Sequence, residues 1–162
     1  MAIRPAVVAD APALARVFFD ARRAALPGVR EAHGEAAVAL WLARVVVAPG
    51  HRAWVAEEDD APVGYLAMAE EGGEDGEAVA LHLYLSPGAW RRRVGSRLLD
   101  AAKAESGGRL SLWCLARNAP ALAFYARHGF RVVRGTDGAA SEEGEPDVLL
   151  AWRAPAPARG RS

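Results

Sequence analysis

The chain has 162 residues, enough for one domain that buries about 70% of its unfolded surface without disulfides or a structural metal. Its 20 basic and 20 acidic residues cancel, which argues against nucleic acid or an anionic membrane as a charge-driven partner. A single cysteine and the lack of a long apolar run at the start are typical of a cytoplasmic protein with no membrane span.

Two amphipathic helices are predicted near the N-terminus, after a short strand at residues 2–4. In the first helix, apolar residues follow the spacing i, i+3, i+4 and i+7 from Leu14 to Ala21. Asp10 is a good N-cap for this helix, which should end near the "LPG" turn. The second helix is predicted over residues 35–46.

Three segments with strand patterns follow, and successive ones can pair antiparallel. They cover residues 51–58, 62–70 and 79–86. The third strand ends at "SPGA", where Pro87 and Gly88 suit the two central positions of a type II turn.

The next helix, predicted from about Arg92 to Glu105, has an unusual start. Three arginines crowd its N-terminus, where the partial positive charge makes each cation unfavourable by up to ~1 kcal/mol. Gly95 in the first turn costs ~1 kcal/mol more relative to alanine. A bound anion such as a diphosphate would offset both costs by accepting hydrogen bonds from the free N–H groups. A solvated basic turn explains the same residues equally well.

The remaining chain alternates strands with one helix and ends in a Pro-rich tail. Strands are predicted over residues 110–117, 130–134 and 146–153, and the tail at 154–162 is predicted to be disordered. Asn118 can cap the helix between the first two of these strands, and Gly129 can end it. The element order therefore predicts a single mixed α/β domain over residues 1–153 with one parallel crossover.

The segment "NAPALAFYARHGF" resembles the GNAT superfamily of acetyl-CoA-dependent N-acetyltransferases. The family pattern is matched at Asn118, Ala121, Phe124, Tyr125, Gly129 and Phe130. The stretches "LYLSPGAWRRRVGSRLL" and "IRPAVVADAPALA" extend the resemblance over nearly the whole folded chain. The resemblance implies a twisted, mostly antiparallel sheet with helices on both faces. It also implies a splayed parallel strand pair that takes acetyl-CoA as co-substrate.

By position, the family's pyrophosphate loop, Gln/Arg-x-x-Gly-x-Gly/Ala, falls on residues 90–95. Only its last glycine is kept, as Gly95, while Trp90 takes the first position and Arg93 replaces the first glycine. The resemblance thus implies a set of coenzyme-binding residues: Leu83, Leu85, Arg91, Arg92, Arg93, Val94, Gly95, Ser96, Asn118 and Tyr125.

The same resemblance suggests catalytic roles. Tyr125 matches the tyrosine that protonates the departing thiolate, which a phenol of pKa ~10 can do at neutral pH. Asn118 is either a coenzyme contact or only the helix cap. His82, which strand alternation places with Ala80 and Tyr84 opposite Leu81, Leu83 and Leu85, is either the base or a structural histidine.

The acceptor side gives a weaker signal. Glu142 and Glu143 lie in the acidic loop before the last strand, which either attracts a cationic amine or is merely solvated. Glu31 and His33 are candidates for the opposite wall. The four histidines have no metal-ligand spacing, so no metal is expected.

The predicted function is transfer of acetyl from acetyl-CoA to a primary amine of a small molecule or peptide, by direct attack in a ternary complex. The alternative is a catalytically inactive acyl-CoA-binding sensor or interaction module of the same fold, which Arg93 at the glycine position favours. A homodimer is compatible with either function.

Overall fold

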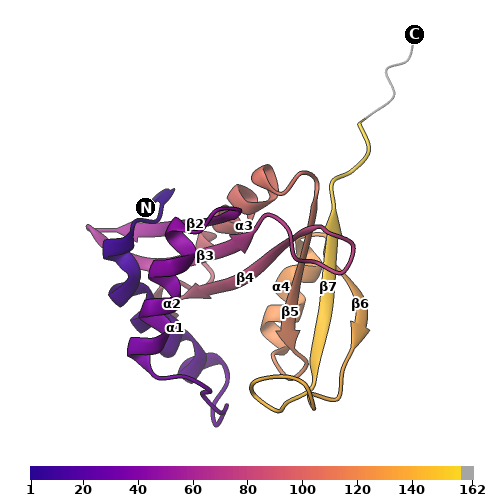
Figure 1. Cartoon of the computed structure of the whole chain (residues 1–162), viewed down its shortest axis with the longest axis horizontal. Coiled ribbons are helices and arrows are strands. Elements are labelled where there is room, and N and C mark those ends of the chain that lie inside the picture. The colour runs from indigo at the N-terminus through magenta and orange to yellow at the C-terminus, as the bar shows by residue number, and fades with distance from the viewer. Residues whose placement is uncertain (158–162) are drawn as a thin grey trace.

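A computed structural model describes residues 1–157 and arranges them as a seven-stranded sheet with helices against both faces (Figure 1). The strands are β1 (Ala2–Pro5), β2 (His51–Glu58), β3 (Ala61–Ala69), β4 (Ala78–Leu85), β5 (Arg109–Leu115), β6 (Arg131–Gly135) and β7 (Asp147–Arg153). The helices are α1 (Ala11–Ala25), α2 (Glu35–Val47), α3 (Val94–Glu105) and α4 (Ala119–Arg127), with 3-10 turns η1 (Val8–Asp10) and η2 (Pro87–Ala89). The predicted mixed α/β fold is confirmed.

The strand order is β1-β2-β3-β4-β5-β7-β6, and every neighbouring pair is antiparallel except β4 and β5. These two strands pair only at Ala78 with Leu110 and at Val79 with Ser111, and then diverge (Figure 1). The predicted splay at the parallel pair is therefore confirmed. Beyond Val79, the edge of β4 that faces β5 has no neighbouring strand within residues 1–157.

Two hydrophobic clusters hold the helices on the sheet. Neighbouring strand residues point to opposite faces, so Val55 and Tyr65 pack with α1 and α2 while Ala56 and Leu66 pack with α3. The cluster that contains α3 continues into α4 and Phe130. The N-terminal helices thus cover one face of the sheet, and α3 and α4 belong to the cluster on the other.

A β-bulge in β4 corrects the predicted alternation around His82. His82 pairs with Ala67 and Ala80 pairs with Met68, so Leu81 is an extra residue without a partner in β3. Ala80 therefore lies in the α3 cluster, on the opposite face from His82. The prediction that both share one face is wrong because period-two alternation fails across a bulge.

Asp10 occupies the predicted N-cap position of α1, but its carboxylate does not cap that helix. The Asp10 carboxylate accepts two hydrogen bonds from the Arg4 guanidinium and one from the Val7 N–H, all at 2.8 Å. The Arg4 hydrogen bonds lower the pKa of Asp10. Its oxygens are engaged there, and its side chain makes no capping hydrogen bond to α1.

The segment between β4 and α3 also differs from the prediction. A type II turn would need positive φ at Gly88, but residues Pro87–Ala89 form the 3-10 turn η2 and Gly88 has no positive φ. Consecutive hydrogen bonds, from Ala89 N–H to Ser86 O and from Trp90 N–H to Pro87 O, hold this tighter conformation.

No helix within residues 1–157 is both long and apolar enough to cross a lipid bilayer. Residues 154–157 follow β7 without helix or strand. The rest of the predicted disordered tail, residues 158–162, lies outside the described residues.

Candidate active site

A cleft of about 1490 Å³ lies where β4 and β5 diverge. One end is formed by the start of α3, by α4 and by β5. The other end reaches α1, α2 and the loop that carries Glu142 and Glu143. The open edge of β4 connects the two ends.

At the α3 end, six consecutive backbone N–H groups, from Arg91 to Ser96, find no acceptor in the described part of the chain. The first hydrogen bond of α3 runs from Arg97 N–H to Arg93 O, at 3.1 Å. Arg91 and Arg93 have φ of 60° and 63°, whereas Arg92 between them does not have positive φ. Such alternation turns successive N–H groups toward one side and creates a concavity for an anion. We call residues 91–96 the cradle.

This conformation explains how three arginines are tolerated before α3. The predicted start at Arg92 is wrong by two residues, because Arg93 is left-handed and the helix begins at Val94. Arg91 and Arg93 line the cleft, whereas Arg92 turns away and donates to Glu58 at 2.8 and 3.0 Å. Two of the three predicted arginines therefore line the cleft.

Gly95 is favoured by close packing rather than by backbone conformation. A Cβ at this position would lie 3.3 Å from Leu85 Cδ1 and 3.3 Å from Phe124 Cζ. The glycine lets the start of α3 approach both β4 and α4, and so brings the cradle to the mouth of the gap.

The backbone of β4 presents polar groups to this gap. Ser86 N–H donates to Val63 O on the β3 side, so by alternation the N–H groups of Leu85 and Leu83 point away from β3. The indole of Trp90 donates to Leu85 O at 3.0 Å, which agrees with that direction. Leu83 and Leu85, predicted as backbone contacts, both line the cleft.

Helix α4 places Tyr125 and Asn118 on the other wall. Asn118 Oδ1 accepts from Ala121 N–H at 3.3 Å, so the predicted cap is confirmed, and the side chain also lines the cleft. Tyr125 is buried between Phe124 and Phe130 and lines the cleft. Burial raises the pKa of Tyr125 far above that of free tyrosine, so the phenol stays protonated.

His82 lies in an aromatic cluster between α1, α2 and the sheet. Its ring stacks on Phe18 and lies 4.4 Å from the Trp41 ring, measured between centroids. Nδ1 is 2.9 Å from the buried Tyr65 hydroxyl. Burial and the charge of Arg22 lower the pKa of His82 to about 3, so the imidazole is neutral at neutral pH. His82 lines the cleft but is a weak base there.

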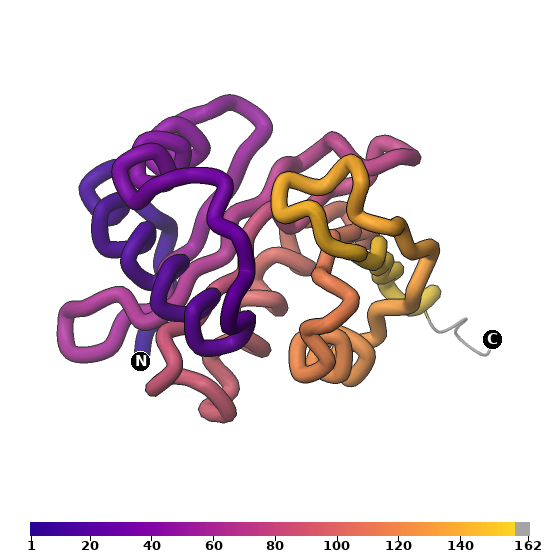
Figure 2. Tube along the Cα trace, turned by 90° about the horizontal axis from the view of Figure 1, so that it is seen from below, coloured from indigo at the N-terminus to yellow at the C-terminus, as the bar shows by residue number. Residues whose placement is uncertain are grey.

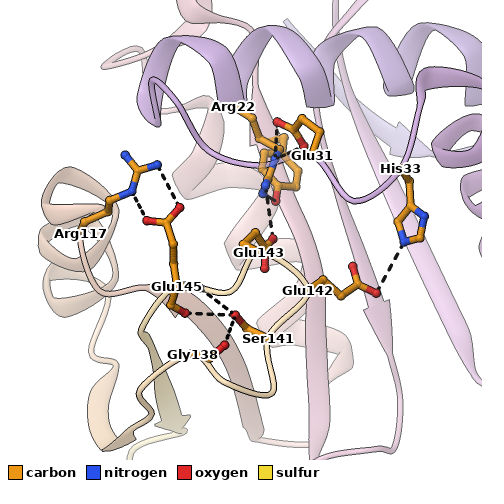
Figure 3. Close-up of polar contacts among 10 residues, drawn as sticks. Arg22, Glu31, His33, Arg117, Gly138, Ser141, Glu142, Glu143 and Glu145 are labelled. Atoms are coloured by element: carbon orange, nitrogen blue, oxygen red, sulfur yellow. Dashed lines mark hydrogen bonds and ion pairs between the residues drawn. The ribbon is translucent and has the colours of Figure 1, made fainter.

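A polar rim, centred on Arg22, Glu31 and Glu143, lies at the end of the cleft away from α3 (Figure 3). At its centre, Arg22 is only 5% exposed. Its Nε donates to both Glu31 oxygens at 3.0 and 3.1 Å, while its terminal nitrogens reach Glu143 and the Tyr84 hydroxyl, each at 3.3 Å. Glu143 lines the cleft, but Glu31 does not. The suggestion that Glu31 forms a cleft wall is therefore wrong, because its carboxylate is turned to Arg22.

The rim joins segments that are distant in sequence. Figure 2 shows the loop after α1 approaching the loop between β6 and β7. His33 Nε2 lies 3.6 Å from Glu142, and Arg117 donates to Pro27 O at 3.4 Å and pairs with Glu145. His33 and Glu142 both line the cleft. The contacts of His33 with Glu142 and of Arg117 with Pro27 connect the two halves of the splayed sheet at this end of the cleft.

The sequence profile of the acetyltransferase (GNAT) domain matches residues 49–132, which include β4, the cradle and all of α4. The chain belongs to the GNAT family. It is therefore an acyltransferase of this family. A comparison with curated protein sequences found no match.

Solved structures share the GNAT architecture over nearly the full chain. An acetyltransferase from Thermus thermophilus is 26% identical, with a TM-score of 0.75 and coverage of 94% of this chain and 96% of that one. The PaiA N-acetyltransferase of Thermoplasma acidophilum, in complex with coenzyme A, is 20% identical, with a TM-score of 0.70 and coverage of 94% and 99%. The ribosomal-protein-alanine N-acetyltransferase of Brucella melitensis is 21% identical, with a TM-score of 0.73 and coverage of 94% and 99%. At these lower identities, the likeness concerns the fold.

The GNAT cleft also contains residues that sequence reasoning missed. Arg22 and Tyr84 both line it, and so does His128, which Ser96 contacts at 3.0 Å. One signal for Arg22 was available, since it follows Phe18 by four residues on the apolar stripe of α1. A charged residue at a core position of a helix is buried only with partners. Within residues 1–157, no three His, Cys, Asp or Glu side chains cluster as metal ligands would.

Proposed function

We propose that this GNAT protein binds acetyl-CoA in the gap between β4 and β5. It transfers the acetyl group directly to a primary amine of a small molecule or peptide. One observation carries the proposal: a single cleft joins the cradle, the open edge of β4 and Tyr125 to the rim. An extended anionic thioester fits one end of this cleft, and an amine can enter from the other.

The cradle is the proposed diphosphate site. Its six N–H groups, which have no acceptor within residues 1–157, offer hydrogen bonds without side-chain reorganisation, and the N-terminus of α3 adds partial positive charge. Arg91 and Arg93 supply charge-assisted contacts from the same wall. The backbone of Leu83 and Leu85 is proposed to hold the pantetheine arm as an added strand would be held.

Bound acetyl-CoA supplies a thioester, whose carbonyl carbon the amine attacks and whose sulfur leaves as a thiolate. Tyr125 is the proposed acid. The Tyr125 hydroxyl has no hydrogen-bond partner among the described residues. In that part of the chain, every fully buried side-chain oxygen does have a partner. The Tyr125 hydroxyl is therefore not fully buried, and it is accessible to the cleft. The raised pKa keeps the proton available to the departing sulfur.

Direct transfer is favoured over an acyl-enzyme because the cysteine in the cleft is poorly suited to nucleophilic attack. Burial raises the pKa of Cys114 to about 11, so its thiol is not ionised at neutral pH. The proton released by the amine still needs an acceptor. That His82 is this base stays a prediction, which its pKa of about 3 disfavours.

The deciding experiment combines calorimetry with acetyl-CoA and free-thiol release with a panel of primary amines. Micromolar binding and amine-dependent thiol release are expected. Tyr125→Phe should lower kcat by ~10²-fold or more with little change in the Kd of acetyl-CoA. Binding without turnover across the panel would favour a non-catalytic module. An unchanged kcat in Tyr125→Phe would remove the acid assignment alone.

A further inference from the structure

Ser96 and His128 form a side-chain contact between the two halves of the molecule. Ser96 Oγ lies 3.0 Å from His128 Nε2. Ser96 is in the first turn of α3 and ends the cradle, whereas His128 follows α4 and lies one turn beyond Tyr125. Both side chains line the cleft. The imidazole is therefore one hydrogen bond away from the proposed diphosphate site.

The surroundings of His128 favour its neutral form when no anion is bound. From α3, Lys103 Nζ donates to His128 O at 2.6 Å, and Asp100 contributes an opposing negative charge. From α4, Arg127 adds positive charge and Phe124 contacts the imidazole, with ring centroids 4.5 Å apart. Burial, Lys103 and Arg127 together lower the pKa of His128, despite Asp100.

We propose that His128, through Ser96, is part of the coenzyme phosphate site and becomes more protonated, taking protons from solvent, when acetyl-CoA binds. The inference rests on the proposed function, because it requires the coenzyme phosphates at the cradle. A neutral His128 can accept the Ser96 hydroxyl proton at Nε2. A protonated His128 donates from Nε2 to Ser96 Oγ, which leaves the Ser96 O–H free to donate to phosphate. A bound phosphate also offsets the positive charges around the imidazole.

The sign of the pH dependence follows from linkage. His128 is neutral in the free protein near pH 7 and gains charge as the anion binds, so acetyl-CoA should bind more tightly as the pH falls. The gain in acetyl-CoA affinity ends below the pKa of His128 in the free protein, because His128 is then protonated both with and without the coenzyme. His128 is then a positioning and binding residue, with an effect on Kd rather than on the chemical step.

The test is calorimetry of acetyl-CoA binding in two buffers of different ionisation enthalpy, which counts the protons taken up. Wild type is compared with His128→Asn, because the coenzyme's own 3′-phosphate also titrates near pH 6. Wild type should take up several tenths of a proton more than the variant. The affinity of wild type for acetyl-CoA should rise ~3–10-fold more than that of the variant between about pH 7.5 and pH 5.5.

Three further measurements sharpen the result. Ser96→Ala keeps the imidazole but removes its link to the cradle, so its affinity gain should fall toward that of His128→Asn. His51→Asn is the matched control, since His51 bonds to Pro49 O and does not line the cleft, and it should match wild type. Dephospho-CoA, which lacks the 3′-phosphate, should retain the difference if the diphosphate is responsible.

Equal proton uptake by wild type and His128→Asn would overturn the inference while leaving coenzyme binding intact. The inference would also fail if His51→Asn lost as much uptake as His128→Asn. Failure of wild type to bind acetyl-CoA at any pH would instead remove the proposed function, and this inference with it. If His128→Asn does not fold, His128→Gln and Ser96→Ala provide the same comparison.

Discussion

Glycine substitution should raise folding stability at two of the three consecutive arginines before α3 and lower it at the third. Arg91 and Arg93 are left-handed, with φ of 60° and 63°, and Arg92 is not. A left-handed conformation costs an L-residue ~1–2 kcal/mol, which glycine avoids. Glycine also makes the unfolded chain more flexible, which costs ~0.4–1 kcal/mol. Arg91→Gly and Arg93→Gly should therefore each stabilise the protein by about 0.5–1 kcal/mol.

Arg92→Gly should do the opposite. This substitution relieves no left-handed strain, because Arg92 has no positive φ, and it has the same cost in the unfolded state. It also removes the ion pair with Glu58, in which the Arg92 side chain is 54% exposed. An exposed pair contributes ~0.5 kcal/mol, so the net loss should be about 1 kcal/mol. In a chain of this size, 1 kcal/mol corresponds to ~2–4 °C in Tm.

Urea unfolding followed by tryptophan fluorescence, without coenzyme, measures these differences at identical chain length and net charge. Binding provides an independent readout. Loss of the Arg91 or Arg93 guanidinium should weaken acetyl-CoA affinity by ~3–10-fold, whereas Arg92→Gly should stay within about twofold. The reasoning is refuted if all three variants lose stability equally, because the two backbone conformations would then carry no strain.

Other predictions concern the cleft. Arg22→Met should lower stability by about 2–3 kcal/mol in urea unfolding, because it leaves Glu31 and Glu143 without their cation; a loss below about 0.5 kcal/mol would contradict this. His82→Gln should reduce acid sensitivity. The folded pKa of about 3 lies below the unfolded value of 6.5, so wild type loses stability as the pH falls through that window, by up to about 1.4 kcal/mol per pH unit. Equal pH slopes would exclude a buried neutral imidazole. Glu143→Gln should raise the KM of a cationic amine ~3–10-fold with unchanged acetyl-CoA affinity, and Glu145→Gln, in the same loop but outside the cleft, is the control.

Local pattern was sufficient for most of the secondary structure. The strand predicted over residues 51–58 has those bounds in β2, and the helix predicted over 35–46 is α2, one residue longer. Both have a hydrophobic period that matches their own geometry, so little depends on distant contacts. The Asn118 cap also depends on a hydrogen bond to a residue only three positions away.

Several of the incorrect predictions involve partners that the local hydrophobic pattern does not reveal. Asp10 stands at the N-cap position of α1, but Arg4 in the first strand donates to its carboxylate, so the side chain does not cap the helix. Alternation assigns His82 and Ala80 to one face, but the pairing of β4 with β3 inserts Leu81 between them. Arg22 has partners that are 9, 62 and 121 residues away, so no local window contains them.

The unusual chemistry at the start of α3 is consistent with a binding site that is built before its ligand arrives. Two left-handed arginines are unfavourable for the free protein, and six consecutive N–H groups have no protein acceptor among the described residues. An anion satisfies the N–H groups and screens the guanidinium charges, but it does not relieve the φ strain, which persists in the complex. Replacement of Arg93 by the family's usual glycine should therefore stabilise the free and the bound protein alike. Only the guanidinium contacts distinguish arginine from glycine in affinity. Arginine at this position thus exchanges about 0.5–1 kcal/mol of folding stability for a positive charge beside the coenzyme.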